Sequence, residues 1–148
     1  MTVRRAVPAD TPALRTMMAD SNGYERAEAR AMIVAFAEGW SVPEGPHEVW
    51  VMEWDGAIAG FHALIPHGDD LELDLFFTAD AAQGTGVGRR LFGHMTDRAK
   101  ALGAARVVIS SNPEAAGFYR RMGATDAGVT PPGDGIAWER PKFELKIG

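Results

Sequence analysis

The sequence predicts a single domain of the mixed α/β class, with a mostly antiparallel sheet, one central pair of parallel strands and flanking helices. Three observations support this prediction. Some short segments alternate apolar and polar residues as strands do, others repeat apolar residues at helical spacing, and one glycine-rich turn joins an apolar strand to an amphipathic helix. The 148 residues contain no linker or internal repeat, so we expect residues 1–148 to fold as one domain.

The composition is that of an ordinary globular protein, and it excludes several kinds of site. Hydrophobic residues make up 46% of the chain and charged residues 24%. Because there is no cysteine, disulfides, thiolate metal ligands and cysteine nucleophiles are excluded. No apolar run approaches the roughly 18 residues of a membrane span, and no signal-peptide pattern follows Met1. We therefore expect a cytoplasmic protein with no membrane partner.

The formal net charge of −5 bears on the class of substrate. A protein that binds a nucleic-acid backbone needs a basic surface, whereas the lysines and arginines here are scattered along the chain. We therefore expect no nucleic-acid partner. An acidic field instead favours a cationic substrate such as an amine.

The N-terminal part of the chain predicts one strand and two helices. Residues 2–7 have the alternation of a short strand. A first helix, capped by Asp10 or Thr11, is expected to stop at Gly23. A second helix is expected from about Tyr24. Its apolar residues recur at helical spacing and are expected to face the core: Ala29, Met32, Ile33, Phe36 and Trp40.

Three consecutive antiparallel strands are expected at the centre of the sheet. Residues 48–54 and 58–65 have strand patterns, and Asp55-Gly56 between them has the sequence of a two-residue hairpin turn. After a second turn, residues 71–78 form the third strand.

The C-terminal half predicts a strand, helix, strand unit, then a short helix and a final strand pair. A helix ending at Gly103 leads to the apolar strand at residues 106–110, which must lie parallel to the strand before the helix. The short helix begins at Asn112, and residues 124–129 and 142–147 form the final pair, joined by a Pro- and Gly-rich loop.

The most informative segment runs from Gln83 to Arg90 and holds three glycines at alternate positions. Backbone N–H groups there can approach a ligand closely, and the following helix adds unpaired donors and a positive dipole end. The segment therefore predicts an anion site, and a phosphate suits it best. No Lys follows Gly88 as a P-loop requires, and the spacing does not fit a dinucleotide fingerprint. The alternative is a plain connecting turn.

Two motifs together resemble those of the GCN5-related N-acetyltransferase (GNAT) family. Gln83, Gly86 and Gly88 match its pyrophosphate loop, Gln/Arg-x-x-Gly-x-Gly/Ala. Residues Asn112 to Tyr119 resemble its Asn-x-x-Ala-x-x-Phe-Tyr segment, at the family's distance from the loop. The expected order of elements is also similar to the GNAT fold along nearly the whole chain. The resemblance implies direct transfer of an acetyl group from acetyl-CoA to an amine within a ternary complex.

The resemblance also implies which residues hold acetyl-CoA. The pyrophosphate is expected on the N–H groups of the loop, with Arg89 or Arg90 either adding contacts or forming a solvated helix face. The pantetheine is expected along the open edge of the strand before the loop, where one N–H polarises the thioester carbonyl. Asn112 is expected to contact this arm, to cap the last helix, or both. Thr85 departs from the family, where a basic residue is usual, and Asp80 departs where Pro is frequent. The full expected set is Phe76, Phe77, Thr78, Gln83, Gly84, Thr85, Gly86, Val87, Gly88, Arg89, Asn112 and Phe118.

Acyl transfer to an amine needs a base, because a primary amine with a pKa near ~10.4 is protonated at pH 7. The resemblance places Glu72 where many family members carry a glutamate that acts through water, and Asp74 is expected on the same strand face. Alternatively, both carboxylates form only the polar face of a strand or hold a cationic substrate. Tyr119 matches the family's general acid for the leaving thiolate; the alternative is a core tyrosine with its hydroxyl at the rim.

The histidines predict no metal site, because none has a metal-ligand spacing. His62 and His67 lie near the central strands and could act as acid or base, whereas His47 and His94 are expected at the surface.

We expect a small-molecule amine as the acceptor. The alternatives are a protein N-terminus or lysine side chain, and a module that binds acetyl-CoA without turnover. The resemblance is also compatible with a homodimer. Residues expected near the substrate rim are Tyr24, Phe36, Trp40, Trp138 and Arg140.

Overall fold

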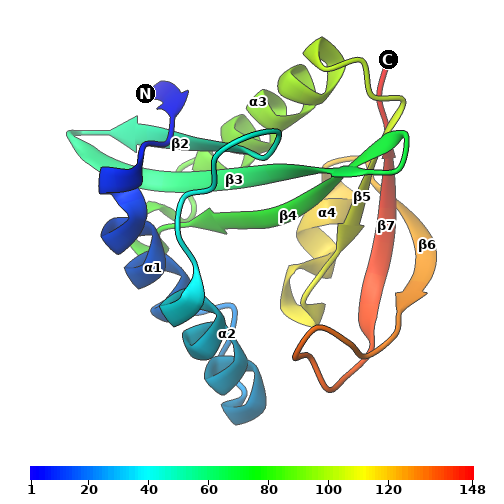
Figure 1. Ribbon diagram of the computed structural model, residues 1–148, viewed down its shortest axis with the longest axis horizontal. Helices are drawn as coiled ribbons and strands as arrows, with labels where there is room; N and C mark the ends of the chain where they lie inside the picture. Colours follow the sequence, from blue (N-terminus) through cyan, green and yellow to red (C-terminus); the bar gives the residue numbers. More distant parts are fainter.

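Seven strands form one sheet, and helices cover both of its faces (Figure 1). The computed structural model describes all 148 residues. In the sheet order β1-β2-β3-β4-β5-β7-β6, the strands are β1 (Thr2–Arg5), β2 (Glu48–Trp54), β3 (Ala57–His67), β4 (Asp70–Thr78), β5 (Arg106–Ser110), β7 (Arg140–Lys146) and β6 (Thr125–Thr130). The helices are α1 (Thr11–Ala19), α2 (Ala27–Gly39), α3 (Val87–Ala101) and α4 (Ala116–Arg121), with 3-10 turns η1 (Pro8–Asp10), η2 (Asp80–Ala82) and η3 (Pro113–Ala115). The predicted mixed α/β class is confirmed.

The sheet is antiparallel except where β4 meets β5. These two strands are parallel and pair only through Leu71 with Val107 and Glu72 with Val108. Beyond these residues they run in different directions (Figure 1). The predicted parallel pair is confirmed, and its early separation leaves the second half of β4 with one edge free of backbone partners.

A β-bulge at Asp74 changes the direction of the side chains along β4. Ala63 of β3 pairs with Leu75 and Leu64 pairs with Leu73, so Asp74 has no partner across the strand pair. Leu73 packs into the cluster under α3 and α4, whereas Leu75 packs into the cluster under α1 and α2. In a regular strand, residues two apart would share one face. The bulge therefore lets both faces of β4 be covered while Asp74 stays exposed at the bend.

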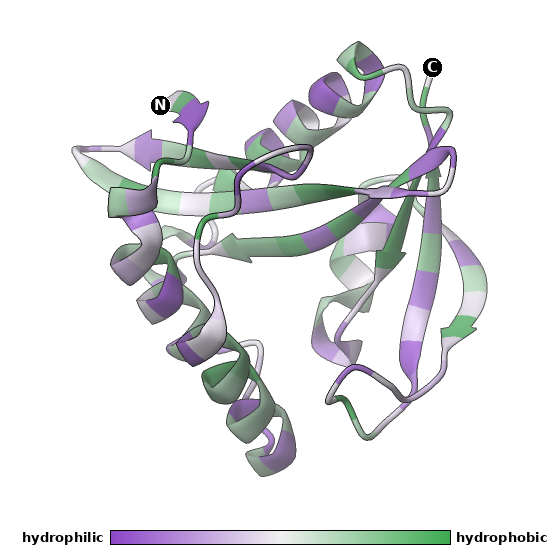
Figure 2. Ribbon diagram, viewed as in Figure 1, coloured by the Kyte–Doolittle hydropathy of each residue, from purple (hydrophilic) through white to green (hydrophobic).

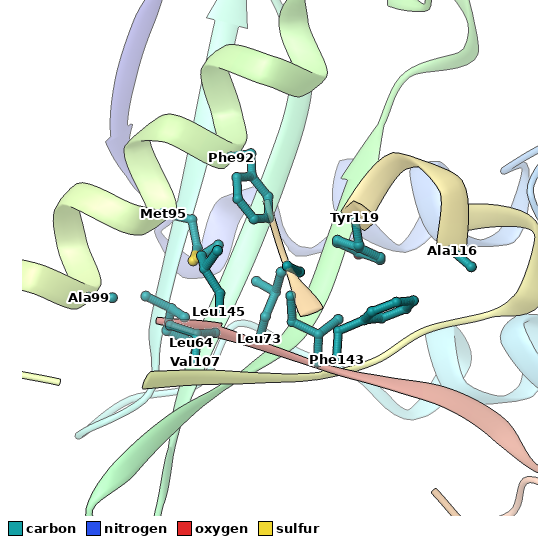
Figure 3. Close-up of a cluster of buried hydrophobic side chains, with 12 residues drawn as sticks. Leu64, Leu73, Phe92, Met95, Ala99, Val107, Ala116, Tyr119, Phe143 and Leu145 are labelled. Carbon is teal, nitrogen blue, oxygen red and sulfur yellow. The ribbon is translucent and has the colours of Figure 1, made fainter. Parts of the chain in front are cut away.

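Two large apolar clusters, one on each face of the sheet, and a smaller one under the start of α3 hold the helices in place. The cluster under α3 and α4 contains Leu64, Leu73, Phe92, Met95, Ala99, Val107, Ile109, Ala116, Tyr119, Ala124, Phe143 and Leu145 (Figure 3). The cluster under α1 and α2 contains Ala6, Leu14, Met18, Ile33, Ala37, Val49, Val51, Phe61, Ala63, Leu75 and Phe77. Figure 2 shows hydrophobic and hydrophilic residues alternating along these helices, as expected where one side is buried.

The first two helices differ from the prediction at their boundaries. α1 ends at Ala19 rather than at Gly23, and α2 begins at Ala27 rather than at Tyr24. Tyr24 instead stacks on Phe77 of β4, with ring centroids 5.8 Å apart. This contact between distant segments is not contained in the helical periodicity of the sequence.

Strand ends also differ from the prediction by one or two residues. β1 stops at Arg5 because the chain then enters η1, and Arg4 forms an ion pair with Asp10 of that turn at 2.8 Å. The final strands are 125–130 and 140–146 rather than 124–129 and 142–147.

A polar cluster is buried between β2, β3 and α3. His62 is fully buried, and its Nε2 lies 2.9 Å from Nδ1 of His94. Arg98 donates hydrogen bonds to both carboxylate oxygens of Glu48, each at 2.9 Å. Burial, followed by the neighbouring His94, lowers the pKa of His62 to about 3. His62 is therefore a neutral structural group, and the expected surface position of His94 is wrong because this residue is half-buried against His62.

The buried His62 predicts that the chain loses stability in acid. Its folded-state pKa of about 3 lies below that of a free histidine, so the unfolded chain takes up a proton that the folded chain does not. This contribution is complete above pH ~6.5 and is lost as the pH falls, by ~1.4 kcal/mol per pH unit. At pH 5 the free energy of unfolding is expected to be about 2 kcal/mol below its value at pH 7.

Urea unfolding between pH 5 and pH 7 tests this expectation, with His62→Gln as the matched variant. In this window Glu48 stays ionised. Burial acts to raise its pKa, but the hydrogen bonds from Arg98 and Trp50, together with nearby positive charges, outweigh burial and lower the pKa overall. Burial also lowers the pKa of His94, which is present in both proteins and acts in the same direction. The difference in pH slope therefore reports His62. Equal slopes in the parent and the variant would contradict the assignment.

Candidate active site

The glycine turn lies at the N-terminus of α3 and is shaped by its backbone. Gly84 and Gly86 have φ values of +79° and +84°, in the left-handed region that favours glycine. A Cβ on either residue would meet no protein atom within 4 Å, so the space beside them is open. Gly86 is the N-cap of α3, and the first N–H groups of the helix after it have no intrahelical partner. These groups form a backbone site for an anion.

Gln83 and Thr85 of this turn make contacts within the chain. The Gln83 Nε2 donates to Oδ1 of Asn22 at 3.1 Å, and the Asn22 Nδ2 donates back to Oε1 of Gln83 at 3.3 Å. The Thr85 hydroxyl donates to the carbonyl of Ala82. The Gln83 side chain thus ties the turn to the connection between α1 and α2, and Thr85 stabilises the turn itself.

A cavity of about 640 Å³ begins at the glycine turn and extends along β4 to α4. Its volume is in the range of small-molecule sites. Ten residues expected at the cofactor line it: Phe76, Phe77, Thr78, Gln83, Gly84, Gly86, Gly88, Arg89, Asn112 and Phe118. Thr85 is not in its wall, and the Val87 side chain is fully buried beside Met52 and Leu91, which leaves only its backbone on this side.

Gly88 brings the two sequence motifs into contact. A Cβ at this position would lie 3.3 Å from the ring of Phe118 in α4. Phe118 in turn packs on Phe76 of β4, with ring centroids 5.5 Å apart. A glycine at position 88 therefore allows α3 and α4 to close around the same stretch of β4.

A second cavity, of about 510 Å³, lies on the other side of the separated strands, between α2 and the segment that leads into β7. Figure 1 shows α2 and this β6–β7 segment on opposite sides of the place where β4 and β5 separate. The cavity wall includes Arg26, Met32, Ile33 and Phe36 from α2 and its start, Glu72 and Asp74 from β4, and Asp134, Ile136, Trp138 and Arg140 from the segment. Tyr24 and Asn112 line both cavities, which therefore meet where β4 has left β5.

Asn112 fastens this meeting point. Its Nδ2 donates to the carbonyl of Gly23 at 3.0 Å and lies 3.4 Å from Oε2 of Glu114. Its side chain makes no capping bond to the 3-10 turn that follows, so the expected cap is wrong. The side chain instead holds the α1–α2 connection against the end of β5.

Glu72 and Asp74 form an acidic pair in the second cavity. The pKa of Glu72 is raised, first by burial and then by the charge of Asp74. Asp74 keeps an exposed side at the bend, but the cavity wall removes part of the solvent around its carboxylate, which raises its pKa as well. The His67 Nδ1 lies 3.7 Å from Oε1 of Glu72. Two carboxylates with raised pKa values in one cavity can accept a proton or hold a cation.

Tyr119 is a core residue that also reaches the first cavity. Its exposed fraction is 6%, and Figure 3 shows it among the buried side chains of the α3 and α4 cluster. Its ring contacts Phe118 and Phe143, at centroid distances of 5.5 Å and 6.0 Å. Burial raises the pKa of the Tyr119 phenol above its usual range. The hydroxyl therefore stays protonated at neutral pH and has a proton to donate.

The sequence did not point to every residue of these walls. Arg121 and Glu114 line the first cavity, and Asp134 lines the second, without any motif that marks them. Of the residues expected near the substrate rim, all but one line the second cavity: Tyr24, Phe36, Trp138 and Arg140. Trp40 lies outside it, just past α2, where it packs on Phe61 with centroids 6.0 Å apart.

No group of three or more histidine and carboxylate side chains is placed to hold a metal ion. None of the helices combines the length and the apolar character that a membrane span requires.

A sheet that opens between its parallel strands, with a glycine turn at a helix N-terminus beside the opening, defines an acyltransferase fold. Residues 18–143 match the family model described as the acetyltransferase (GNAT) domain. The chain therefore belongs to the GNAT family, and it is an N-acetyltransferase.

Similar proteins agree with this assignment. Over 140 residues the chain is 28% identical to 5-NmdU N-acetyltransferase of Pseudomonas phage PaMx11, covering 91% of this chain and 94% of that protein. The ribosomal-protein-S18-alanine N-acetyltransferase from Escherichia coli shares the fold with a TM-score of 0.76 at 18% identity, over 99% of this chain and 94% of the other. The protein yncA from Salmonella typhimurium, solved with its cofactor acetyl-CoA, has a TM-score of 0.67 at 20% identity, over 100% and 94% of the two chains.

Proposed function

We propose that the chain transfers the acetyl group of acetyl-CoA to the primary amine of a small molecule while both substrates are bound. The observation that carries this proposal is the meeting of two cavities at Tyr24 and Asn112, beside the free edge of β4. One cavity begins at a backbone anion site and the other contains two carboxylates. Cavities that meet at one point hold two reactants close together, which is what direct transfer requires.

The first cavity suits acetyl-CoA by its charge and its shape. The open space beside Gly84 and Gly86 leaves room for a pyrophosphate at the N-terminus of α3, where unpaired N–H groups favour an anion. Arg89 and Arg121 line the same cavity and add positive charge, which offsets that of Glu25 and Glu114 in its wall. Bound there, acetyl-CoA supplies an activated acetyl group as a thioester.

The free edge of β4 suits the rest of the cofactor. Phe76 and Phe77 pair with His62 and Phe61 of β3 on one side, and both residues line the first cavity. Backbone groups on the unpaired edge are available to bind the pantetheine amides, with Thr78 and Asn112 beside them. One N–H of this edge would stabilise the oxyanion of the tetrahedral intermediate.

Proton movement is assigned to side chains on the two sides of the meeting point. Glu72 or Asp74 accepts the proton of the amine, directly or through water, because both line the acceptor cavity. Tyr119 holds a proton for the sulfur that leaves, because it lines the cofactor cavity and its pKa is raised by burial.

The role of Glu72 is tested by Glu72→Gln, which keeps the shape and removes the proton acceptor. We expect kcat/KM to fall roughly tenfold, since Asp74 remains in the same cavity, and the loss to shrink as the pH approaches the pKa of the amine. In the parent, kcat/KM should rise with pH as Glu72, whose pKa is raised, loses its proton.

Asp74→Asn measured in parallel shows which carboxylate is the base, and Glu38→Gln on the exposed side of α2 is the control. If both cavity variants keep the parent's pH profile, water is the base and the carboxylates only orient the amine.

The acceptor is tested by measuring CoA release with a panel of amines. The panel contains alkylamines, amino acids and aminoglycosides, a peptide with a free N-terminus, a lysine peptide, and 5-NmdU. The phage relative's name supports 5-NmdU as a second candidate acceptor. Release stimulated by small amines and not by the peptides supports the proposal; release stimulated only by the peptides would overturn it.

A further inference from the structure

We propose that Arg140 and Trp138 form a subsite for an oxyanion of the acceptor, so that the acceptor is a small amine that also carries a carboxylate or phosphate group. This inference rests on the proposed function, because it concerns the second cavity as the acceptor site.

The first observation is that Arg140 has no ionic partner. The other half-buried arginines each have a partner, which is a carboxylate oxygen within 4.0 Å for Arg4 and Arg98 and a backbone carbonyl for Arg15 and Arg30. Arg140 has no such partner, although Glu72 and Asp74 line the same cavity. Its positive charge is near enough to both carboxylates to lower their pKa values slightly, against the larger effect of burial. Its side chain is also half-buried, unlike that of a solvated surface arginine.

The second observation is that two hydrogen-bond donors in this wall are unsatisfied. The Arg140 Nε and the Trp138 Nε1 are buried and have no hydrogen-bond partner. Leaving a buried donor unpaired destabilises a folded chain, and native chains rarely leave two such donors beside one cavity without a use. The remaining such atom is Nδ1 of His62, which lies in the polar cluster under α3 and outside this wall.

The chemistry of these donors selects an oxyanion. A guanidinium binds a carboxylate or phosphate through two parallel N–H groups, and Nε is one of the donors in that arrangement. The indole N–H of Trp138 can only donate. Arg26 lies over the Trp138 ring, 5.3 Å from its centroid, and so restricts its orientation. An oxygen acceptor bound here satisfies both donors after small side-chain shifts.

The charges of the cavity also favour a bipolar acceptor. Glu72 and Asp74 on β4, with Asp134 in the same wall, attract the ammonium form of the amine, and Arg140 from β7 attracts the oxyanion. Met32, Ile33 and Phe36 of α2 provide an apolar wall. Such a site suits an amino acid or an amino phosphate with an apolar body. It does not suit the N-terminus of a long peptide, which has no oxyanion near its amine.

The experiment compares matched acceptors with and without the oxyanion. CoA release is measured with leucine against isopentylamine, with phenylalanine against phenethylamine, and with phosphoethanolamine against ethanolamine. The parent should favour the anionic member of the accepted pair by about ten- to a hundredfold in kcat/KM, mainly through KM. A preference in the leucine or phenylalanine pair indicates a carboxylate, and one in the ethanolamine pair indicates a phosphate.

Arg140→Gln should remove this preference, lowering kcat/KM about ten- to a hundredfold for the anionic acceptor and less than about twofold for the matched amine. Trp138→Phe removes only Nε1–H among the donors and should cost about five- to tenfold for the same acceptor. Arg106→Gln, at a surface ion pair outside both cavities, is the control. If Arg140→Gln does not fold, Arg140→Lys replaces it, because lysine keeps the positive charge but lacks the two parallel donors. This variant should show part of the decrease in kcat/KM for the anionic acceptor.

The outcomes separate this inference from the proposed function. Turnover of isopentylamine, phenethylamine or ethanolamine that equals or exceeds turnover of the anionic partner would overturn the oxyanion subsite and leave the acetyltransferase reaction intact. Turnover of 5-NmdU and of no other acceptor would also overturn the oxyanion subsite and leave the acetyltransferase reaction intact. If no panel compound is acetylated, binding of the anionic compounds is measured by calorimetric titration with CoA present. The oxyanion subsite is overturned if leucine, phenylalanine and phosphoethanolamine all fail to bind. Absence of acetyl-CoA binding would overturn the proposed function itself.

Discussion

Replacing Gly86 by Asp is expected to raise the Kd for acetyl-CoA by about a hundredfold or more. The new carboxylate would stand at the N-cap of α3, where it repels a phosphate by about 3 kcal/mol at ~6 Å and competes for the same N–H groups. The residue has a φ of +84° and open space around its Cβ position, so the fold should survive with a strain of roughly 1 kcal/mol. Isothermal titration calorimetry with acetyl-CoA measures the effect.

Gly103→Asp is the matched control for this variant. Gly103 follows the other end of α3, has a φ of +78°, and a Cβ added to it would also meet no atom within 4 Å. Both variants should melt a few degrees below the parent, but only Gly86→Asp should lose the cofactor. Parent-like affinity in Gly86→Asp would show that the glycine turn does not hold the pyrophosphate.

Tyr119→Phe is expected to lower kcat by on the order of ten- to a thousandfold, with little change in the affinity for acetyl-CoA. The substitution removes one hydroxyl and keeps the ring in its contacts with Phe118 and Phe143. Burial raises the pKa of the hydroxyl, which has no hydrogen bond inside the protein to lose, so the melting temperature should barely change. Single-turnover kinetics at saturating acetyl-CoA separates this loss from slow product release.

Other results would assign Tyr119 a different role. A rise in the KM for acetyl-CoA with an intact kcat would make it a residue that positions the cofactor. A loss of about 1 kcal/mol in stability with full kcat would make it a core residue alone. Either result removes the general-acid role, although the family assignment would stand.

Local signals in the sequence were sufficient for the fold and for the outline of the glycine turn. The alternation of apolar and polar residues at 48–54 reflects which strand face is buried. The spacing of the glycines at 84, 86 and 88 reflects the backbone conformation of a turn. The short strand at 106–110 after the helix required a parallel pair, and β4 and β5 form it. These features could be predicted because each depends on the residue pattern of one short segment.

The acceptor side could be predicted only in part. Glu72, Trp138 and Arg140 were named from the sequence, but nothing in it showed that Arg140 would line one cavity with the β4 carboxylates without pairing with them. The bulge at Asp74 was likewise not marked by any glycine or proline in β4. Bulges and unsatisfied donors depend on how strands and loops from different parts of the chain meet.

Short-range patterns of burial and backbone conformation were thus enough to predict a mixed α/β domain with a glycine turn before its third helix, and the resemblance of two motifs to the GNAT family predicted the acetyltransferase. Which residues those patterns bring into contact was settled by packing in three dimensions. Gln83 bonds to Asn22 across 61 residues, and Asn112 bonds to Gly23 across 89 residues. Both bonds hold the connection between α1 and α2 against other parts of the site, namely the glycine turn and the end of β5. No periodicity along the chain records contacts over such separations.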